Sequence, residues 1–442
     1  KSLSRNFANK GFKLSLYNRF VKNKEEKVAE LFITEFPELS DAKAFEDLAA
    51  FVQSLSLPRK IMLMVHAGQA TDDLIDQLIP LLDKGDVLID GGNAYYLDTE
   101  KRINLLKKWG IHFIGSGVSG GEEGALKGPS IMPGGSIEGY QLIQPFFKKI
   151  AATNNKGINC CNYIGAGGAG HFVKMVHNGI EYAEMQLLAE LVQFLKITAG
   201  FTNDLIALLL HPFLQTEKTS YLLEITIQIL QKKWKEEYLV DQILDNAGNK
   251  GTGSWTTIEA AKRGIPIPTL TAALNARFMS SMWEDRRQAA AALLTSTQKQ
   301  SVNIDSVMEA YQLCRIINHH QGFQLIETVS KQESWDINLS ELAQTWTAGC
   351  IIRSRLMEEI EMLIGQSNNL LMHPIMVQKC NQSVDSLKQM LSVALFNELP
   401  MDCFSASAQY LFGYKQAASG ASLIQAQRDF FGAHTYQLKE DP

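Results

Sequence analysis

The first third of the chain alternates short apolar runs with amphipathic stretches, and this alternation restricts the possible folds more than any other feature. Four runs have the length and composition of buried strands: 12–18, 60–65, 86–91 and 112–117. The segments 69–82 and 98–110 between them carry apolar residues at helical spacing. Strands that alternate with helices are typical of βαβ units, so this region predicts an α/β domain with a parallel, doubly wound sheet.

The start of this region is unusual because the chain opens on a predicted helix, residues 1–11, with Gly11 as its end. In a doubly wound sheet the first strand lies near the centre, where both neighbours need its hydrogen bonds. Without such a strand, two buried strand edges would be unpaired. We therefore expect a first strand and its glycine loop, absent from this sequence, to precede Lys1.

The pattern changes at about residue 168. A long helical pattern covers 171–195, and further helical stretches follow as far as 383–399. After a short glycine-bearing linker, the chain ends in a polar and aromatic tail. This organisation predicts a dinucleotide-binding domain at 1–167, an all-helical domain at 168–411 and a C-terminal tail at 412–442.

The segment "IGAGGAG" (164–170) has the glycine spacing of a dinucleotide-binding loop, and two interpretations compete. A true fingerprint is followed by a second strand with an acidic residue about 20 positions on. Glu184 and Glu190 lie at that distance, but within a continuous helical pattern. We therefore favour the second interpretation, in which the glycines let a long helix begin close against another backbone.

Composition excludes several classes of function. The 42 basic and 47 acidic side chains leave a net charge of −5, which argues against binding to nucleic acid or a membrane surface. The six cysteines show neither a disulfide framework nor paired metal-ligand spacing, as expected of a cytoplasmic protein without a metal. No apolar run reaches the roughly 18 residues of a membrane span.

Polar residues follow the predicted strands, at the sheet edge where α/β proteins bind ligands. Asn18 and Arg19 follow the first run; Arg19 suits the 2′-phosphate of NADP, although an ordinary polar strand exit explains it equally well. "DGGN" (90–93) ends another strand. The glycine-rich segment 117–135, predicted to be a loop, offers Ser119 and the amides of Gly120 and Gly121 to a ligand.

The stretch "KMVHNGIE" places Lys174, His177, Asn178 and Glu181 on one stripe of a helix. A salt-bridged polar face is one interpretation of this stripe. The other is acid–base chemistry for an alcohol oxidation, because a desolvated Lys174 could lose its proton near neutral pH and a nearby Glu181 could hold one.

Basic residues elsewhere are weaker signals. Lys250 and Thr252 in "NKGTGSW" lie on a glycine turn that suits a phosphate or is a plain surface turn. Arg277 in a helical run and Arg428 in the tail indicate little by themselves.

Taken in order, seven motifs resemble the 6-phosphogluconate dehydrogenase family of the oxidative pentose phosphate pathway, and the resemblance covers essentially the whole chain. The motifs are YNR, DGGN, GVSGGEEGALKGPSIMPGG, GHFVKMVHNGIEY, NKGTGSW, AGCIIR and LIQAQRDFFGAHTY. The family's glycine fingerprint is missing ahead of Lys1. Phe20 stands where the family usually has Thr, and His66 where Lys is common, which weakens the expected preference for NADP over NAD.

The resemblance implies NADP-dependent oxidative decarboxylation of 6-phosphogluconate to ribulose 5-phosphate and CO2. Lys174 would take the C3 hydroxyl proton, and Glu181 would supply a proton to C1. It implies a homodimer in which each tail reaches the partner subunit. The substrate would be bound by Asn93, Ser119, Gly120, Gly121, His177, Asn178, Tyr182, Lys250, Thr252, Arg277, Arg428 and His434, the last two from the partner. The cofactor would be bound by Asn18, Arg19, Val65 and Asn93.

Two alternatives compete with this interpretation. A related β-hydroxyacid dehydrogenase would share the glycine loop and the helix lysine, but such enzymes are much shorter. A non-catalytic descendant or truncated form, binding only substrate or partners, is favoured by the missing strand and disfavoured by the Lys174–Glu181 stripe.

Overall fold

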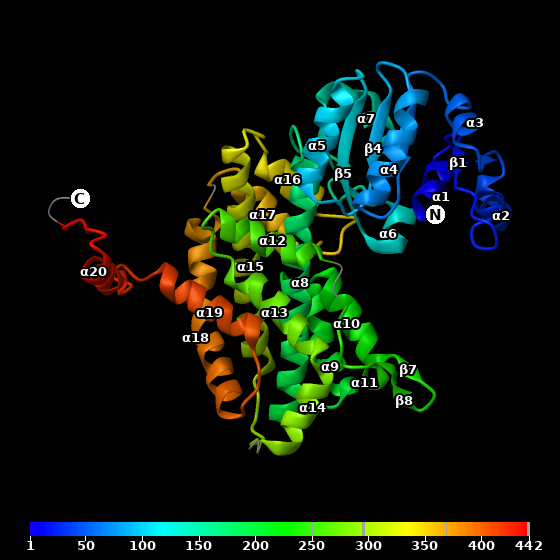
Figure 1. Cartoon of the computed structure of the whole chain (residues 1–442). Coiled ribbons are helices and arrows are strands. Elements are labelled where there is room, and N and C mark those ends of the chain that lie inside the picture. Colours follow the sequence, from blue (N-terminus) through cyan, green and yellow to red (C-terminus); the bar gives the residue numbers. More distant parts are fainter. Residues whose placement is uncertain (249–250, 294–296, 368, 440–442) are drawn as a thin grey trace.

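The structure is a computed structural model, and it describes residues 1–248, 251–293, 297–367 and 369–439. Figure 1 shows an α/β domain, a helical body below it and a C-terminal segment that projects away from both. The predicted fold class, an α/β domain followed by a large helical region, is confirmed.

The N-terminal domain contains the four predicted strands and two more. Its strands are β1 (Ser15–Tyr17), β2 (Lys43–Phe45), β3 (Lys60–Leu63), β4 (Val87–Asp90), β5 (His112–Ser119) and β6 (Ser130–Gly135). Its helices are α1 (Ser2–Asn9), α2 (Val28–Glu35), α3 (Leu48–Gln53), α4 (Gln69–Leu78), α5 (Tyr96–Lys107), α6 (Gly121–Lys127) and α7 (Ile137–Ile150).

The strands form two separate sheets, not one. β1 pairs in parallel with β2, and β3, β4, β5 and β6 form the second sheet in that order. Within the described ranges no strand lies between β1 and β3. The two unpaired edges expected from the sequence are therefore present.

The prediction of a glycine-rich loop at 117–135 was wrong. This segment completes β5, forms α6 and returns as β6, which pairs antiparallel with β5, so the sheet is not purely parallel. The glycines that suggested a loop allow the sheet to pack closely against the start of the long helix that follows at residue 169. A Cβ at Gly134 would lie 2.4 Å from the Gly170 amide nitrogen, closer than non-bonded atoms approach.

The C-terminal region is built around two long, largely buried helices, α8 (Ala169–Phe194) and α15 (Ile304–Gln332), which pack against each other. The other helices up to the tail are α9 (Asn203–Leu210), α10 (Tyr221–Gln231), α11 (Leu239–Gln242), α12 (Thr252–Lys262), α13 (Pro268–Ser281), α14 (Trp283–Ala292), α16 (Leu339–Thr345), α17 (Arg355–Ile364), α18 (Pro374–Phe396) and α19 (Asp402–Tyr414). A small hairpin of β7 (Lys233–Trp234) and β8 (Glu237–Tyr238) interrupts them.

Membrane-spanning segments were sought in the described residues. No single helix there is long and apolar enough to cross a bilayer. One helix pair, Ala169–Ala199 with Asn203–Gln215, passes on length and composition but is bent by 119°. Most of α8, the main part of that pair, is buried in the protein core.

The glycines of "IGAGGAG" let α8 begin against the sheet, as the sequence indicated. A Cβ at Gly170 would lie 2.3 Å from the Gly115 carbonyl oxygen of β5 and 2.5 Å from the Met132 oxygen of β6. Glu184 and Glu190 lie inside α8. The glycines of this motif therefore allow close packing, which brings the helix face from Lys174 to Glu181 next to the sheet.

The tail extends beyond α19 and contains α20 (Ala421–Gly432). Its apolar side chains are not covered by the rest of the chain: Phe430 is 96% exposed and Phe431 is 74% exposed. In Figure 1 this red segment lies away from the helical body.

Candidate active site

The centre of the candidate site is the His177 ring on α8. Its Nδ1 atom lies 3.4 Å from Lys174 Nζ and 3.6 Å from a carboxylate oxygen of Glu181. The three side chains come from successive turns of one helix face, so their spacing in the sequence is enough to bring them together. His177 is fully buried, and Lys174 is 7% exposed.

The end of β5 supplies the other contact to His177. Ser119 Oγ lies 3.1 Å from His177 Nε2, so one ring joins the sheet edge to the helix stripe. The next residue, Gly120, has φ of +121°, and a Cβ there would lie 2.4 Å from the Gly349 carbonyl oxygen. Only glycine fits this turn, which positions Ser119 against the helix.

Burial shifts the proton affinities of this cluster in opposite directions. Desolvation lowers the pKa of Lys174, and the Glu181 carboxylate partly opposes this effect. Desolvation raises the pKa of Glu181, against the charges of Lys174 and Arg277. The pKa of His177 is well below its usual range because the ring is buried next to Lys174. Both shifts favour a neutral lysine beside a protonated glutamic acid.

His171 anchors the start of α8 and was not singled out from the sequence. Its Nε2 lies 3.1 Å from the Asp90 carbonyl oxygen, and its Nδ1 lies 2.6 Å from Thr99 Oγ. A carbonyl oxygen only accepts, so Nε2 carries the proton and Nδ1 accepts from Thr99. The position of His171 could have indicated this role, because the residue lies three positions before Lys174 on the same helix face.

A second group of predicted residues lies further along α8. The Arg277 guanidinium of α13 stacks 3.4 Å above the Tyr182 ring and donates to the Gly248 carbonyl oxygen. A Cβ at Gly253 would lie 2.8 Å from that ring, so the start of α12 also packs there. Arg277 lies close enough to Glu181 to influence its charge.

Some predicted residues are not brought to this cluster or are not described. Asn93 follows β4 and is exposed, and Asn178 is buried on α8. Lys250 lies outside the described residues, and only the backbone of Thr252, at the start of α12, is described. Arg428 and His434 are exposed on the tail, with Arg428 donating to Gln425 and His434 against Phe431. Within one chain these two are not part of the site.

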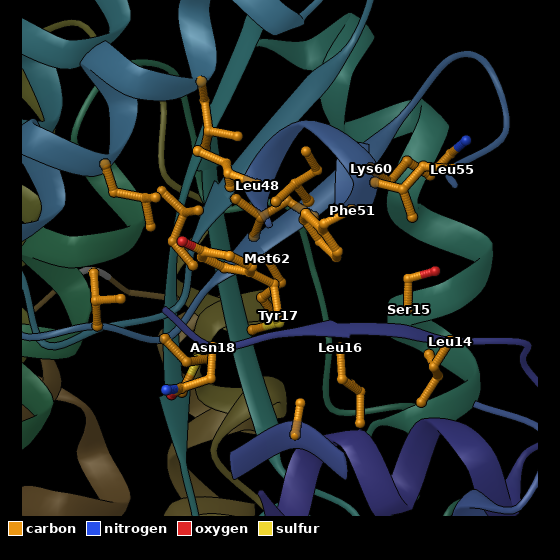
Figure 2. A pocket seen from close by; sticks show the side chains of 18 of the residues that line it. Leu14, Ser15, Leu16, Tyr17, Asn18, Leu48, Phe51, Leu55, Lys60 and Met62 are labelled. Carbon is orange, nitrogen blue, oxygen red and sulfur yellow. The ribbon is translucent and has the colours of Figure 1, made fainter. Parts of the chain in front are cut away.

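Three of the predicted cofactor residues, Asn18, Arg19 and Val65, line a separate cavity of about 1180 Å³ beside β1 and β3, whereas Asn93 is not among the residues that line it. Asn18, labelled in Figure 2, and Arg19 both donate to the Glu25 carboxylate, the arginine at 3.1 Å and 3.3 Å. Val65 and His66 follow β3 and line the same cavity. Glu25 was missed; it lies six positions after Arg19, and no periodic pattern marks the turn that brings the two side chains together.

A sheet domain whose strand ends face a helix with a buried lysine, a buried histidine and a partly buried glutamate is typical of dinucleotide-dependent dehydrogenases. Two family models match the chain: the NAD binding domain of 6-phosphogluconate dehydrogenase at residues 1–165, and the C-terminal domain of 6-phosphogluconate dehydrogenase at residues 170–442. The chain belongs to the 6-phosphogluconate dehydrogenase family.

Individual relatives support this assignment over the full length. The decarboxylating 6-phosphogluconate dehydrogenase of Citrobacter amalonaticus is 43% identical over 449 residues, covering 99% of both chains. That of Escherichia coli K12 is also 43% identical, covering 99% of this chain and 94% of the relative. The Plasmodium falciparum enzyme, solved in its apo form, with NADP+ and with 6-phosphogluconate, superposes with a TM-score of 0.95 at 35% identity, covering 100% of this chain and 96% of that one. The chain is thus an oxidoreductase of the decarboxylating type.

Proposed function

We propose that this chain oxidises and decarboxylates 6-phosphogluconate with NADP as the electron acceptor. The observation that supports this most is the Lys174–His177–Glu181 cluster, where a buried base and a partly buried acid flank one neutral imidazole. The Plasmodium falciparum relative has been solved in complex with the same substrate and with the same cofactor. We assign cofactor binding to 1–167, the reaction to 168–411 and the subunit exchange to 412–442.

In this proposal Lys174, in its neutral form, takes the proton of the C3 hydroxyl during oxidation. The oxidised nicotinamide, when bound, accepts the hydride from C3. The keto acid that forms loses CO2 because its new carbonyl accepts the electrons of the breaking bond. Glu181 then donates its proton to C1 of the enediol, and the raised pKa of Glu181 supports this role.

The sugar acid would lie between β5 and α8. Ser119 with the amides of Gly120 and Gly121 forms one wall, and His177 with Asn178 forms the other, with Asn93 at the end of β4. The phosphate would be held by Tyr182, Arg277, Lys250 and Thr252. Because Arg277 is already stacked on Tyr182, its guanidinium is pre-oriented for a dianion.

The residues at the end of β1 fit the adenosine end of NADP. Arg19 is 70% exposed and presents its guanidinium at the carboxyl end of a strand, as 2′-phosphate recognition requires. Asn18, Val65 and Asn93 would complete the contacts. A 2′-phosphate would have to compete with the Glu25 carboxylate for the Arg19 guanidinium.

A homodimer with exchanged tails accounts for the exposed tail. Phe430 and Phe431 are large apolar side chains left uncovered by their own chain, as expected of a segment that packs on another subunit. Arg428 and His434 would then reach the partner's phosphate site. We further propose that the dimer works in the cytoplasm, as the sequence indicates.

One experiment tests the binding of 6-phosphogluconate and its oxidation with NADP separately. The purified chain is given 6-phosphogluconate labelled at C1, and dinucleotide reduction and labelled CO2 are measured with NADP and with NAD. Isothermal calorimetry measures 6-phosphogluconate binding in parallel. Equal amounts of reduced dinucleotide and CO2, with NADP preferred, are expected. Substrate binding without reduction would locate the failure in the cofactor domain, and absence of both would refute the proposal.

A further inference from the structure

A buried carboxylate of the helical domain is bonded to the start of α5. Figure 1 shows that α5 belongs to the α/β domain and α12 to the helical body below it. Glu259 of α12 is 2% exposed, and its two oxygens each accept a hydrogen bond from one of two neighbouring phenols, Tyr95 and Tyr96. Lys262 and Arg263 flank the same carboxylate at 2.9 Å and 3.6 Å. We call these five residues the Glu259 bridge.

The negative charge of Glu259 is compensated within the bridge. Arg263 donates to the Tyr96 hydroxyl at 3.0 Å, and that hydroxyl donates to the carboxylate at 2.8 Å. Desolvation opposes ionisation of Glu259, but hydrogen bonds from the two phenols and from Lys262 outweigh it and lower its pKa. Burial and the bond to Glu259 raise the pKa of Tyr95 and bring that of Tyr96 to about 12. The phenols therefore stay protonated and the carboxylate stays ionised at neutral pH, so these bonds persist during turnover.

On the side of the α/β domain, the bridge holds the loop that leaves β4. Asn93 lies in this loop, two residues before Tyr95 and three before Tyr96. Tyr96 is buried, and its ring centroid lies 5.2 Å from that of Phe172 on α8. Ala94, the residue that follows Asn93, is also buried. The backbone that carries the exposed Asn93 side chain is therefore anchored directly behind it.

On the side of the helical domain, the bridge holds α12. Glu259 lies about two turns after the first residue of this helix. Trp255, on the same helix, packs against Tyr95 with ring centroids 5.2 Å apart. Thr256 Oγ1 donates to the Met175 carbonyl oxygen of α8 at 2.9 Å. Helix α12 is thus fixed both to the long helix α8 and to the loop after β4.

We propose that Glu259 is a positioning residue, which sets the place of the Asn93 loop relative to the first turn of α12. The inference rests on the proposed function, in which Asn93 contacts the sugar acid and the cofactor, and the first turn of α12 contacts the phosphate. One carboxylate then fixes the two groups that hold opposite ends of the substrate. Because a misplacement of about 1 Å can lower a rate about 100-fold, loss of the bridge should slow hydride transfer more than it weakens substrate binding.

The test compares Glu259→Gln with the wild-type chain in single-turnover reactions, with enzyme in excess over NADP and with saturating 6-phosphogluconate. The glutamine oxygen can accept from one phenol, but its amide nitrogen only donates, so one bond is lost with little change in volume. The rate constant of dinucleotide reduction is expected to fall about five- to twentyfold, while the calorimetric Kd of 6-phosphogluconate changes less than about threefold. Partly unfolded protein would lower the amplitude of the reaction and leave its rate constant unchanged, so the rate constant separates positioning from stability.

Two further variants control this result. Tyr95→Phe combined with Tyr96→Phe removes both bonds from the other side of the bridge, and the rate constant should fall at least as far as in Glu259→Gln. Adding Glu259→Gln to this pair should lower the rate constant little further, because the three changes act on one network. Tyr410→Phe in α19 removes a buried phenol that bonds to His320, outside the bridge, and should leave the rate constant unchanged.

Amide hydrogen exchange locates the effect. The amides of Asp98 and Thr99 donate to the Tyr95 carbonyl oxygen and report on the start of α5. In Glu259→Gln they should exchange about three- to tenfold faster, and in Tyr410→Phe at the wild-type rate. An unchanged rate constant of reduction in Glu259→Gln, with or without faster exchange, would overturn this role and leave the proposed function standing. Absence of reduction by the wild-type chain would refute the proposed function and this role together.

Discussion

The backbone of Gly117 lies directly against Lys174: a Cβ at position 117 would come within 2.4 Å of the Lys174 Cβ. The last part of β5 is therefore packed tightly onto α8, and it covers the base of the Lys174 side chain. The sheet contributes the burial, and the helix contributes the base. Desolvation by this burial lowers the pKa of Lys174.

Substitution Gly117→Ala is expected to separate strand and helix and to admit water to Lys174. Overpacking of this kind costs about 1–3 kcal/mol of unfolding free energy. We expect kcat to fall by about tenfold or more, since misplacement of a reacting group is costly. Gly365→Ala after α17, where a Cβ would lie 3.6 Å from the Ser340 side chain, is the matched control and should leave kcat unchanged. Wild-type kcat in Gly117→Ala would show that the contact does not matter for turnover.

The pH dependence of turnover should reflect the Lys174–Glu181 pair. The lowered pKa of Lys174 means that its neutral, active form is lost as pH falls. The raised pKa of Glu181 means that its protonated form is lost as pH rises. A bell-shaped pH profile of kcat is expected, and its two apparent pKa values belong to the pair and not to either residue alone. Glu181→Gln should lower kcat and flatten the alkaline limb of the pH profile. If this limb is unchanged in the variant, another group is responsible for it.

Dinucleotide preference should respond to Glu25, which holds Arg19 in the structure. Glu25→Gln frees the guanidinium, and affinity for 2′,5′-ADP, measured by calorimetry, is expected to rise about two- to fourfold because exposed ion pairs are weak. Affinity for 5′-AMP should be unchanged. Arg19→Ala should weaken 2′,5′-ADP binding alone. Equal effects on both nucleotides would show that Arg19 does not meet the 2′-phosphate.

Inside the helical domain, Arg315 of α15 and Glu184 of α8 form a fully buried ion pair at 2.8 Å. Arg315→Met leaves the Glu184 carboxylate buried and unpaired, which should cost about 3–5 kcal/mol. The double variant Glu184→Met with Arg315→Met should recover most of this loss in urea denaturation, since no charge is left uncompensated. A double variant as unstable as Arg315→Met alone would mean that packing, not charge, dominates at this position.

Much of the fold follows from local sequence signals, and the rest depends on contacts between distant residues. The predicted strands at 60–65 and 86–91 contain β3 and β4, because buried parallel strands are continuous apolar runs. The stripe from Lys174 to Glu181 could be placed because a helix fixes side-chain directions. The strand β6 was missed because its glycines, selected for packing against Gly170, imitate a loop.

The electrostatic partners could not be predicted from the sequence. Desolvation by burial lowers the pKa of His171, and its hydrogen-bond partners Asp90 and Thr99 are 81 and 72 residues away. The Arg19–Glu25 pair is local in sequence, but a chain that bends back by six residues is not visible in a periodic pattern. In the proposed homodimer, the positions of Arg428 and His434 relative to the site would depend on a second subunit, and no pattern within one chain supplies that geometry.

The central claim, that Lys174 is the base of the reaction, is tested most directly by Lys174→Met, which preserves the buried alkyl chain and removes the amine. The measurement is 6-phosphogluconate-dependent dinucleotide reduction, with substrate affinity measured by calorimetry on the same preparation. We predict a fall in kcat of about 10²- to 10⁴-fold with substrate still bound. Turnover within a few fold of the wild type would contradict the assignment and move the base to another group on α8.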